Sequence, residues 1–195
     1  AATTVENYRK LKDAGIGTYI LFQETYHKES YEQLHPTGPK HDYAYHTEAM
    51  DRAMQAGIDD VGIGVLFGLN TYKYDFVGLL MHAEHLESFY GVGPHTISVP
   101  RIRKADDIDP KAFTYAIDDE TFKKIIALIR ISVPYTGMIV STRENKEVPE
   151  CSLQHEVFEE ESLTLGNIRT MALVSDSTLV LVNKQSDILF QVVEL

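Results

Sequence analysis

The stretch Gly137-Met138-Ile139-Val140-Ser141-Thr142-Arg143-Glu144 decides the fold, because it joins an apolar run of the strand type to a group of polar side chains. The guanidinium of an arginine can bind a carboxylate through two parallel hydrogen bonds, and hydroxyls add further donors. We therefore predict that Ser141, Thr142 and Arg143 bind the carboxylate of a small substrate at the end of a strand. The motif alone does not decide a function, because such strand ends are common.

Three earlier segments share this organisation, in which a helical pattern is followed by an apolar strand. The strands are predicted at residues 18–22, 61–66 and 95–99, and with residue 137 they recur about every 40 residues. Capping residues such as Thr4 and Asp118 mark helix starts, and residues 28–45 are predicted to be a long polar loop. Helices and strands that alternate in this way are typical of βα units around a parallel sheet.

The predicted strands are continuously apolar, which indicates a sheet covered on both faces. A barrel and an open doubly wound sheet both satisfy this pattern. We favour a barrel, because no glycine-rich phosphate turn follows a strand and polar residues end at least three of the four strands, as at the active-site face of a barrel. The predicted fold class is α/β: a partial TIM-like β/α barrel of about four βα units, roughly half of a complete one.

The character of the chain changes after the last of these strands. Strand patterns at residues 168–174, 178–182 and 188–193 alternate with short polar turns, and no further helix is predicted. We therefore divide the chain into a partial barrel, residues 1–148, and a short β-rich tail, a β-meander over residues 149–195 of unknown relation to the barrel. A fusion, a frameshift or an artefact of gene assembly would each produce such a change.

Charge and cysteine content limit the kinds of partner. With 18 basic and 29 acidic residues the net charge is −11, which argues against a nucleic-acid or membrane surface. No stretch approaches the roughly 20 apolar residues that span a bilayer, so we expect a cytoplasmic protein. The single cysteine, Cys151, excludes an internal disulfide and a metal cluster held by several thiolates of these 195 residues.

Several polar residues near the predicted strand ends are candidates for ligand binding. Gln23 and Glu24 end the first strand, and adjacent strand side chains point to opposite faces, so we expect only one in a pocket unless the strand has already turned. Glu24 suits an amine or a ribose hydroxyl, and a capping network is an equally good interpretation. Arg52 is either a surface residue or reaches over the barrel rim. Gly62 and Gly64 would let a flat group approach the backbone.

Other polar residues have structural interpretations that we prefer. In His82-Ala83-Glu84-His85 the two histidines have a spacing that can bind a metal, but no third ligand is apparent. We predict a solvated or core-edge pair and no metal site. Arg101 and Arg103 follow the third strand and would attract an anion, although pairing with residues 106–107, both aspartates, is the plainer interpretation.

Taken together, six motifs resemble those of the tyrosine lyases of the radical S-adenosylmethionine (SAM) superfamily, in the branch that matures the iron-only FeFe-hydrogenase. The thiamine-pathway 2-iminoacetate synthases share part of the set and match less well around residues 91–94. The resemblance covers about residues 1–148, and it is specific because the motifs occur in the family's order. The motifs are Phe22-Gln23-Glu24-Thr25-Tyr26-His27, His35-Pro36-Thr37-Gly38-Pro39-Lys40, Asp51-Arg52-Ala53-Met54, Gly57-Ile58-Asp59-Asp60-Val61-Gly62-Ile63-Gly64, Pro94-His95-Thr96-Ile97-Ser98-Val99-Pro100-Arg101 and Ser141-Thr142-Arg143-Glu144.

The resemblance implies a radical SAM-type β/α barrel that cleaves S-adenosylmethionine reductively with a 4Fe-4S cluster. The resulting 5′-deoxyadenosyl radical takes hydrogen from the tyrosine amine, and cleavage of the Cα–Cβ bond gives p-cresol and dehydroglycine. In the hydrogenase branch an auxiliary cluster then forms carbon monoxide and cyanide for the hydrogenase H-cluster. The implied partners are tyrosine and hydrogenase maturation proteins.

The resemblance also implies roles for individual residues. Ser141, Thr142 and Arg143 would hold tyrosine, with Arg143 on its carboxylate. The cofactor-binding candidates are Gln23 and Glu24 beside S-adenosylmethionine, Arg52 on its methionyl carboxylate, and Ile63 and Val65 in a strand that passes its adenosine.

The chain departs from the family pattern in two places. The cluster-binding motif CxxxCxxC, which the family carries upstream of this region, does not occur in the 195 residues, and neither do the auxiliary-cluster cysteines that should follow Glu144. We therefore expect a fragment of a radical SAM tyrosine lyase, with a missing upstream piece and no activity alone. The alternatives are a thiamine-pathway 2-iminoacetate synthase, a non-catalytic half-barrel module for binding or assembly, and a sugar-phosphate enzyme, which the lack of a glycine-rich phosphate loop disfavours.

Overall fold

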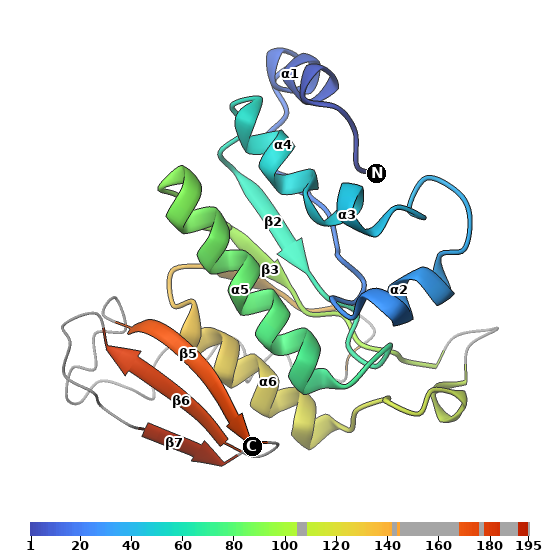
Figure 1. Cartoon of the computed structure of the whole chain (residues 1–195), viewed down its shortest axis with the longest axis vertical. Coiled ribbons are helices and arrows are strands. Elements are labelled where there is room, and N and C mark those ends of the chain that lie inside the picture. Colours follow the sequence, from blue (N-terminus) through green and yellow to red (C-terminus); the bar gives the residue numbers. More distant parts are fainter. Residues whose placement is uncertain (105–108, 142–143, 145–167, 176–177, 184–190, 195) are drawn as a thin grey trace.

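Helices and strands alternate in the first part of the chain, and the described residues after 144 form strands (Figure 1). The computed structural model describes residues 1–104, 109–141, 144, 168–175, 178–183 and 191–194. Its helices are α1 (Val5–Asp13), α2 (Lys28–Leu34), α3 (Tyr43–Thr47), α4 (Ala49–Gln55), α5 (Tyr72–Tyr90), the 3₁₀ helix η1 (Pro110–Ala112) and α6 (Asp119–Ser132). Its strands are β1 (Tyr19–Ile20), β2 (Val61–Gly64), β3 (Thr96–Ser98), β4 (Gly137–Ile139), β5 (Ile168–Ser175), β6 (Thr178–Asn183) and β7 (Gln191–Glu194).

Strands β1 to β4 form one parallel sheet in the order β1-β2-β3-β4. This confirms the predicted α/β class with its succession of βα units. The register pairs Gly62 with Thr96 and Thr96 with Gly137. Pairing continues past β1, because the Gln23 amide donates to the Gly64 carbonyl over 2.8 Å. All four strands end on the same side of the sheet, and we call that side the carboxyl edge.

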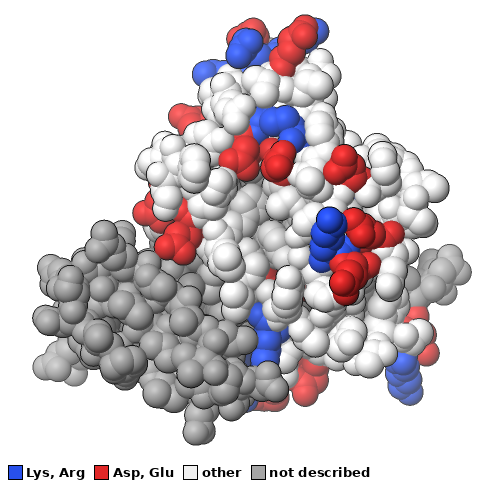
Figure 2. Space-filling view, in the orientation of Figure 1, with Lys and Arg blue, Asp and Glu red and all other residues white. Residues whose placement is uncertain are grey.

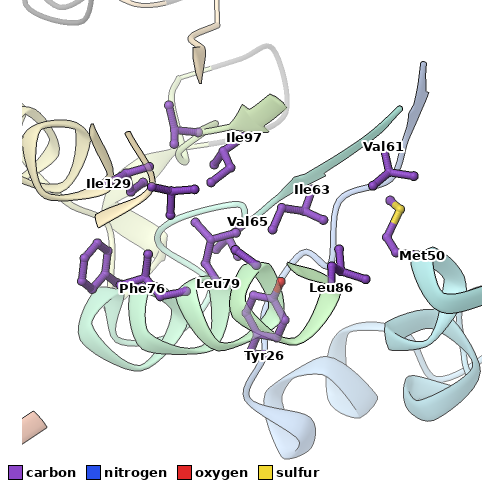
Figure 3. Packing of buried hydrophobic residues seen from close by; sticks show 14 of the residues in the cluster. Tyr26, Met50, Val61, Ile63, Val65, Phe76, Leu79, Leu86, Ile97 and Ile129 are labelled. Carbon is purple, nitrogen blue, oxygen red and sulfur yellow. The ribbon is translucent and has the colours of Figure 1, made fainter. Parts of the chain in front are cut away.

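Helices α4, α5 and α6 cover one face of this sheet (Figure 1). The side chains of Ile63, Val65 and Ile97 belong to the same hydrophobic core as Leu79 of α5 and Ile129 of α6 (Figure 3). Burying an apolar side chain of this size contributes roughly 1.5–3 kcal/mol. The packing of these helices on the sheet therefore stabilises the strands that lead to the carboxyl edge.

On the opposite face of the sheet, side chains cover the central strand, whereas the outer strands are exposed to solvent. A Cβ atom added at Gly62 would lie 2.8 Å from Cγ1 of Ile20, so the side chain of the edge strand covers the glycine. On the outer strands, Ile20 is 40% exposed and Ile139 is 42% exposed. We predicted that the strands are covered on both faces of the sheet. Among the described residues, this is true of the central strand β2 and not of β1 and β4.

Helix ends follow local signals in the sequence. The hydroxyl of Thr4 accepts a hydrogen bond from the amide three residues on over 3.3 Å, and the carboxylate of Asp118 does the same over 2.7 Å. Gly15 and Gly57, which follow α1 and α4, have φ angles of +81° and +90°. A residue with a Cβ rarely adopts this conformation, so glycine stops both helices there.

The prediction of a polar loop over residues 28–45 is wrong for much of that segment. Helices α2 and α3 lie there, capped by the side chains of His27 and Asp42. Tyr31 of α2 is fully buried, and its hydroxyl donates to the Lys40 carbonyl over 2.7 Å. The longer of the two helices has seven residues, which is too short to show an apolar helical period in the sequence.

The tail contains a second sheet, in which β5, β6 and β7 pair antiparallel in chain order. This is the predicted β-meander. In the part of the chain that the structure describes, these strands share no pairing with β1 to β4. None of the described helices is both long enough and apolar enough to cross a membrane.

Candidate functional site

Gln23 and Glu24 lie at the carboxyl edge, where the chain leaves β1. Gln23 is 4% exposed, and its Nε2 atom donates to Thr47 Oγ1 over 2.8 Å. Glu24 has a φ angle of +69°, which is uncommon for a residue with a side chain, and such conformations cluster at ligand sites. Its carbonyl accepts from the Leu66 amide over 2.9 Å. The strand has thus turned at Glu24, so alternation no longer decides which way its side chain points.

The carboxylate of Glu24 pairs with the ammonium group of Lys40. Both groups keep access to solvent, with 17% of the Glu24 side chain and 36% of the Lys40 side chain exposed. The buried Tyr31 hydroxyl, bound to the Lys40 carbonyl, holds the Lys40 backbone. An amino acid carries an ammonium and a carboxylate, so a ligand of this class can replace the internal ion pair with two contacts of its own.

The side chains of Ile63 and Val65 point away from such a ligand. They are 1% and 0% exposed and lie in the core beneath α5 (Figure 3). A cofactor contact through these residues would therefore come from their backbone. Gly64, which lies between them, is closely packed, since a Cβ there would lie 2.8 Å from both Phe22 Cδ1 and the Ser98 carbonyl oxygen. The expectation that a flat group approaches the backbone at the glycines of β2 stays a prediction.

Arg52 of α4 has its guanidinium engaged by the amino-terminal segment and by α3. Its Nε atom donates to the Thr3 carbonyl over 2.9 Å, and Nη2 donates to the Tyr45 carbonyl. The guanidinium carbon lies 3.8 Å from the centre of the Tyr45 ring, and Nη1 lies 3.7 Å from Glu48 Oε2. Arg52 therefore joins α4 to the segments beside it, and its contact with a methionyl carboxylate stays a prediction.

Ser141 lies at the carboxyl edge, two residues after the end of β4, whereas Thr142 and Arg143 lie outside the described residues. The structure does describe the next residue, Glu144, whose amide donates to the Ser141 carbonyl over 3.0 Å. The side chain of Glu144 is 0% exposed. Of the three residues predicted to bind a carboxylate, the structure therefore describes Ser141.

A buried ion-pair network that sequence reasoning missed holds Glu144. Arg101 places Nε 2.9 Å from Glu144 Oε1 and Nη2 2.5 Å from Oε2. Nη2 also donates to Asp119 Oδ1 over 2.5 Å. Burial alone would lower the pKa of Arg101, but its hydrogen bonds to Glu144 and Asp119 raise that pKa above its ordinary value. The expected partners, residues 106–107, lie outside the described residues, and the pairing across two strand ends was not visible in the linear sequence.

The two histidines of α5 contact different partners. His82 Nδ1 lies 2.8 Å from Tyr26 Oη, and His85 Nε2 lies 2.7 Å from Asp51 Oδ1. Burial lowers the pKa of His82 to about 4, so this ring is neutral at physiological pH. Within the described ranges, no three His, Cys, Asp or Glu side chains group in a way that could hold a metal ion.

A hollow of about 510 Å³ lies between α5 and the α3–α4 segment, on the outer side of the helix layer. Tyr26, Tyr43, Met81 and both histidines of α5 line it, and none of the predicted site residues does. Figure 2 views the molecule from the α5 side and shows acidic and basic side chains interspersed on that face. The hollow is therefore separate from the residues gathered at the carboxyl edge.

The described residues suit one part of the implied cofactors, the amino acid group of S-adenosylmethionine. Glu24 and Lys40 have charges complementary to the amino acid group of S-adenosylmethionine and are partly exposed. Contact between the β2 backbone and the adenosine stays a prediction. Iron–sulfur clusters are held by cysteine thiolates, and the single cysteine, Cys151, lies outside the described residues. The structure thus shows no ligand of a 4Fe-4S cluster in its described part.

Comparisons with known proteins place these observations in a family. A family model described as Biotin and Thiamin Synthesis associated domain matches residues 98–156. The 2-iminoacetate synthase of Salmonella typhimurium is 32% identical over 142 residues, which is 72% of this chain and 37% of that protein.

Two solved structures are similar over most of the chain. A crystal structure of HydG, described as a maturase of the FeFe-hydrogenase, is 65% identical with a TM-score of 0.74 and covers 77% of this chain and 33% of its own. HydG from Carboxydothermus hydrogenoformans is 45% identical with a TM-score of 0.72 and covers 78% of this chain and 35% of its own. The chain therefore spans about a third of the length of the relatives that it matches.

Proposed function

We propose that this chain, which belongs to the radical SAM family of HydG and 2-iminoacetate synthase, supplies the tyrosine-binding side of a tyrosine lyase that acts in FeFe-hydrogenase maturation. The observation that carries the proposal is the 65% identity with HydG over 77% of the chain. The polar residues at the carboxyl edge support it, because barrel enzymes build their active sites at that edge. The reaction and partners of the whole protein are part of the proposal, since the chain spans about a third of its relatives.

In this proposal the segment after β4 binds tyrosine. Arg143 forms two parallel hydrogen bonds to the substrate carboxylate, while Ser141 and Thr142 contribute hydroxyl donors. Fixing the carboxylate orients the amine and the Cα–Cβ bond of the substrate. When bound, S-adenosylmethionine and a 4Fe-4S cluster supply the radical chemistry that starts the cleavage to p-cresol and dehydroglycine.

The chain contributes a smaller part of the cofactor site. Glu24 and Lys40 bind the amino acid group of S-adenosylmethionine, Gln23 orients that segment through Thr47, and the backbone of β2 passes the adenosine. The 195 residues have one cysteine, so the thiolates of a cluster held by three cysteines must come largely from outside them. We therefore expect no turnover by these 195 residues alone.

Substrate binding is tested by titrating tyrosine, and tyramine, which lacks the carboxylate, into the full gene product that contains residues 1–195. Hydrogen bonds to charged groups contribute about 1.5–3 kcal/mol, so tyrosine should bind at least about tenfold more tightly. Arg143→Leu should remove most of this preference. The matched control is Arg9→Leu, on the exposed side of α1, which should leave the preference intact. Equal affinities for the two ligands in the unaltered protein would contradict the proposal.

A second candidate function is that of a thiamine-pathway 2-iminoacetate synthase. It is favoured by the 32% identity with the Salmonella typhimurium enzyme and by the family match over residues 98–156. Both candidates release p-cresol, but the maturase alone goes on to form carbon monoxide and cyanide. Carbon monoxide trapped by deoxymyoglobin in proportion to p-cresol would support the maturase. p-Cresol without carbon monoxide would support the synthase.

A further inference from the structure

We propose that Asp75 of α5 is a positioning residue for Glu24, and that it acts by holding the backbone directly after Glu24. The inference rests on the proposed function, which places the amino acid group of S-adenosylmethionine at Glu24 and Lys40. Asp75 does not touch the cofactor in this proposal. Its hydrogen bonds fix a strained turn, and the turn sets the direction of the Glu24 carboxylate.

Glu24 is the centre of a tight turn at the carboxyl edge. The Thr25 amide donates to the Gln23 carbonyl over 3.0 Å, and Glu24 has a φ angle of +69°. A hydrogen bond between residues two apart and a positive φ at the residue between them are features of a γ-turn that is rare and strained. Such a conformation persists only where the surrounding structure holds it. The contacts on each side of Glu24 therefore decide where its carboxylate points.

The sheet holds the turn before Glu24 and at Glu24 itself. The Gln23 amide donates to the Gly64 carbonyl over 2.8 Å, and the Leu66 amide donates to the Glu24 carbonyl over 2.9 Å. Both partners lie in β2 or just after it. The chain then leaves the sheet, and the next two residues, Thr25 and Tyr26, are held by α5.

Asp75 is the residue of α5 that holds them. Its Oδ1 atom accepts from the Thr25 hydroxyl and from the Tyr26 amide, each over 2.8 Å. Asp75 and Thr25 are 0% exposed and Tyr26 is 7% exposed, so these bonds are shielded from water. The apolar side of α5 packs in the core beneath the sheet. One carboxylate oxygen thus ties the end of the turn to a rigid helix 50 residues further along the chain.

This arrangement requires an acceptor atom rather than a charge. The second oxygen of Asp75, Oδ2, is buried and has no hydrogen-bond partner among the described residues. Burial raises the pKa of Asp75 to about 6, because the charged form loses its solvation. An asparagine keeps an oxygen for both donors without the charge, so Asp75→Asn should preserve the turn. Asp75→Ala removes the acceptor and leaves the Thr25 hydroxyl and the Tyr26 amide unpaired.

The test compares the affinities of the full gene product for S-adenosylmethionine and for 5′-methylthioadenosine, which lacks the amino acid group. The protein is reconstituted anaerobically with iron and sulfide and titrated without reductant, so that the cofactor is not cleaved. Asp75→Ala should weaken S-adenosylmethionine binding about tenfold and 5′-methylthioadenosine binding less than about twofold, because the Glu24 carboxylate faces the ammonium group alone. Asp75→Asn should stay within about threefold of the unaltered protein for both ligands.

A double-mutant cycle shows whether Asp75 acts through Glu24. Glu24→Gln alone should weaken S-adenosylmethionine binding about tenfold, because it removes the charge that faces the ammonium group of the cofactor. Adding Asp75→Ala to Glu24→Gln should weaken it by less than about twofold more, since residues that act together are not additive. The matched control is Asp118→Ala, which removes an exposed carboxylate that caps α6 through a backbone amide and should change neither affinity.

A second variant protects the test against loss of the fold. If circular dichroism shows that Asp75→Ala is unfolded, Thr25→Val keeps the shape of the side chain and removes one of the two hydrogen bonds to Asp75. It should weaken S-adenosylmethionine binding about threefold and leave 5′-methylthioadenosine binding unchanged.

The outcomes separate the inference from the proposed function. Folded variants that change neither affinity, that weaken both ligands in parallel, or that are fully additive with Glu24→Gln would overturn the inference and leave the proposed function standing. An Asp75→Asn variant that behaves like Asp75→Ala would overturn it as well. If Glu24→Gln has no effect on S-adenosylmethionine binding, the proposed cofactor site fails and the inference fails with it.

Discussion

Single residues show where the sequence was informative and where it was not. The position of Gln23 and Glu24 at a strand end followed from the point where the apolar run stops. The direction of the Ile63 and Val65 side chains did not, because a strand that is apolar throughout carries no alternation to tell its two faces apart. Glu144 was visible as part of a motif, but its partner Arg101 is supplied by another strand end, 43 residues away in the sequence.

A prediction at this scale concerns Gly78 of α5. A Cβ atom there would lie 2.5 Å from Cγ and 2.6 Å from Cβ of Tyr26, whose amide is tied to Asp75. Overpacking of this kind costs about 1–3 kcal/mol, and the better helix propensity of alanine offsets about 1 kcal/mol. We expect Gly78→Ala to lower the free energy of unfolding in urea by about 1 kcal/mol.

The matched control for this change is Gly17→Ala. A Cβ at Gly17 meets nothing within 4 Å, and its φ angle lies outside the positive region. The control should be neutral or slightly stabilising, because alanine restricts the unfolded chain. Equal stability of the two variants would show that the Tyr26 ring moves aside without cost.

At the scale of elements, the parallel strands and the longer helices were predictable from apolar runs, caps and glycines, as α6 and Asp118 illustrate. Helices α2 and α3 were not, because they are held by capping side chains and by the burial of Tyr31 rather than by an apolar stripe of their own. Their packing matters for the candidate site, because the segment between α2 and α3 contains Lys40 and places it beside Glu24.

Two buried groups of α5 make the stability of the fold depend on pH in opposite directions. Burial lowers the pKa of His82 from 6.5 to about 4, so the unfolded chain takes up a proton first and the contribution of His82 is lost as pH falls from about 6.5 to 4. Burial raises the pKa of Asp75 from 3.8 to about 6, so the folded state keeps its proton and stability falls as pH rises from about 4 to 6. The two effects oppose each other between about pH 4 and 6.

This opposition predicts the behaviour of His82→Asn, in which an amide oxygen can replace Nδ1 as the partner of Tyr26. Between pH 6.5 and 4 the unaltered protein should lose on the order of 2 kcal/mol more stability than the variant. The variant keeps the effect of Asp75 and loses that of His82, so its free energy of unfolding should rise as pH falls from about 6 to 4. Urea unfolding across this range measures both. His41→Asn, at an exposed position, is the control, and parallel profiles for all three proteins would refute the prediction.

At the scale of the whole molecule, the change after residue 148 was visible in the sequence as the end of βα alternation. The structure shows a parallel sheet and an antiparallel sheet with no strand pairing between them in the described residues. We propose that residues 1–148 and 149–195 are separate modules. The sequence pattern indicates whether each sheet is parallel or antiparallel. It does not show which distant surfaces of the chain pack together, because it reports on neighbouring residues.

The proposal of two modules predicts the effect of truncation. A chain of residues 1–148 should unfold in urea at the same midpoint as residues 1–195, because the parallel sheet shares no described strand pairing with the tail. It should also remain monomeric in size-exclusion chromatography. A lower midpoint or aggregation of the shortened chain would instead support a tail that covers the open edge of β1 or β4.

The central claim is tested most directly by measuring p-cresol. The full gene product that contains residues 1–195, reconstituted anaerobically with iron and sulfide and supplied with reductant, S-adenosylmethionine and tyrosine, is expected to release p-cresol, detected by mass spectrometry. Arg143→Leu should reduce the rate with saturating cofactor at least about tenfold, since the lost contacts contribute about 1.5–3 kcal/mol. Absence of p-cresol from the unaltered protein with an intact 4Fe-4S absorbance would contradict the assignment as a tyrosine lyase.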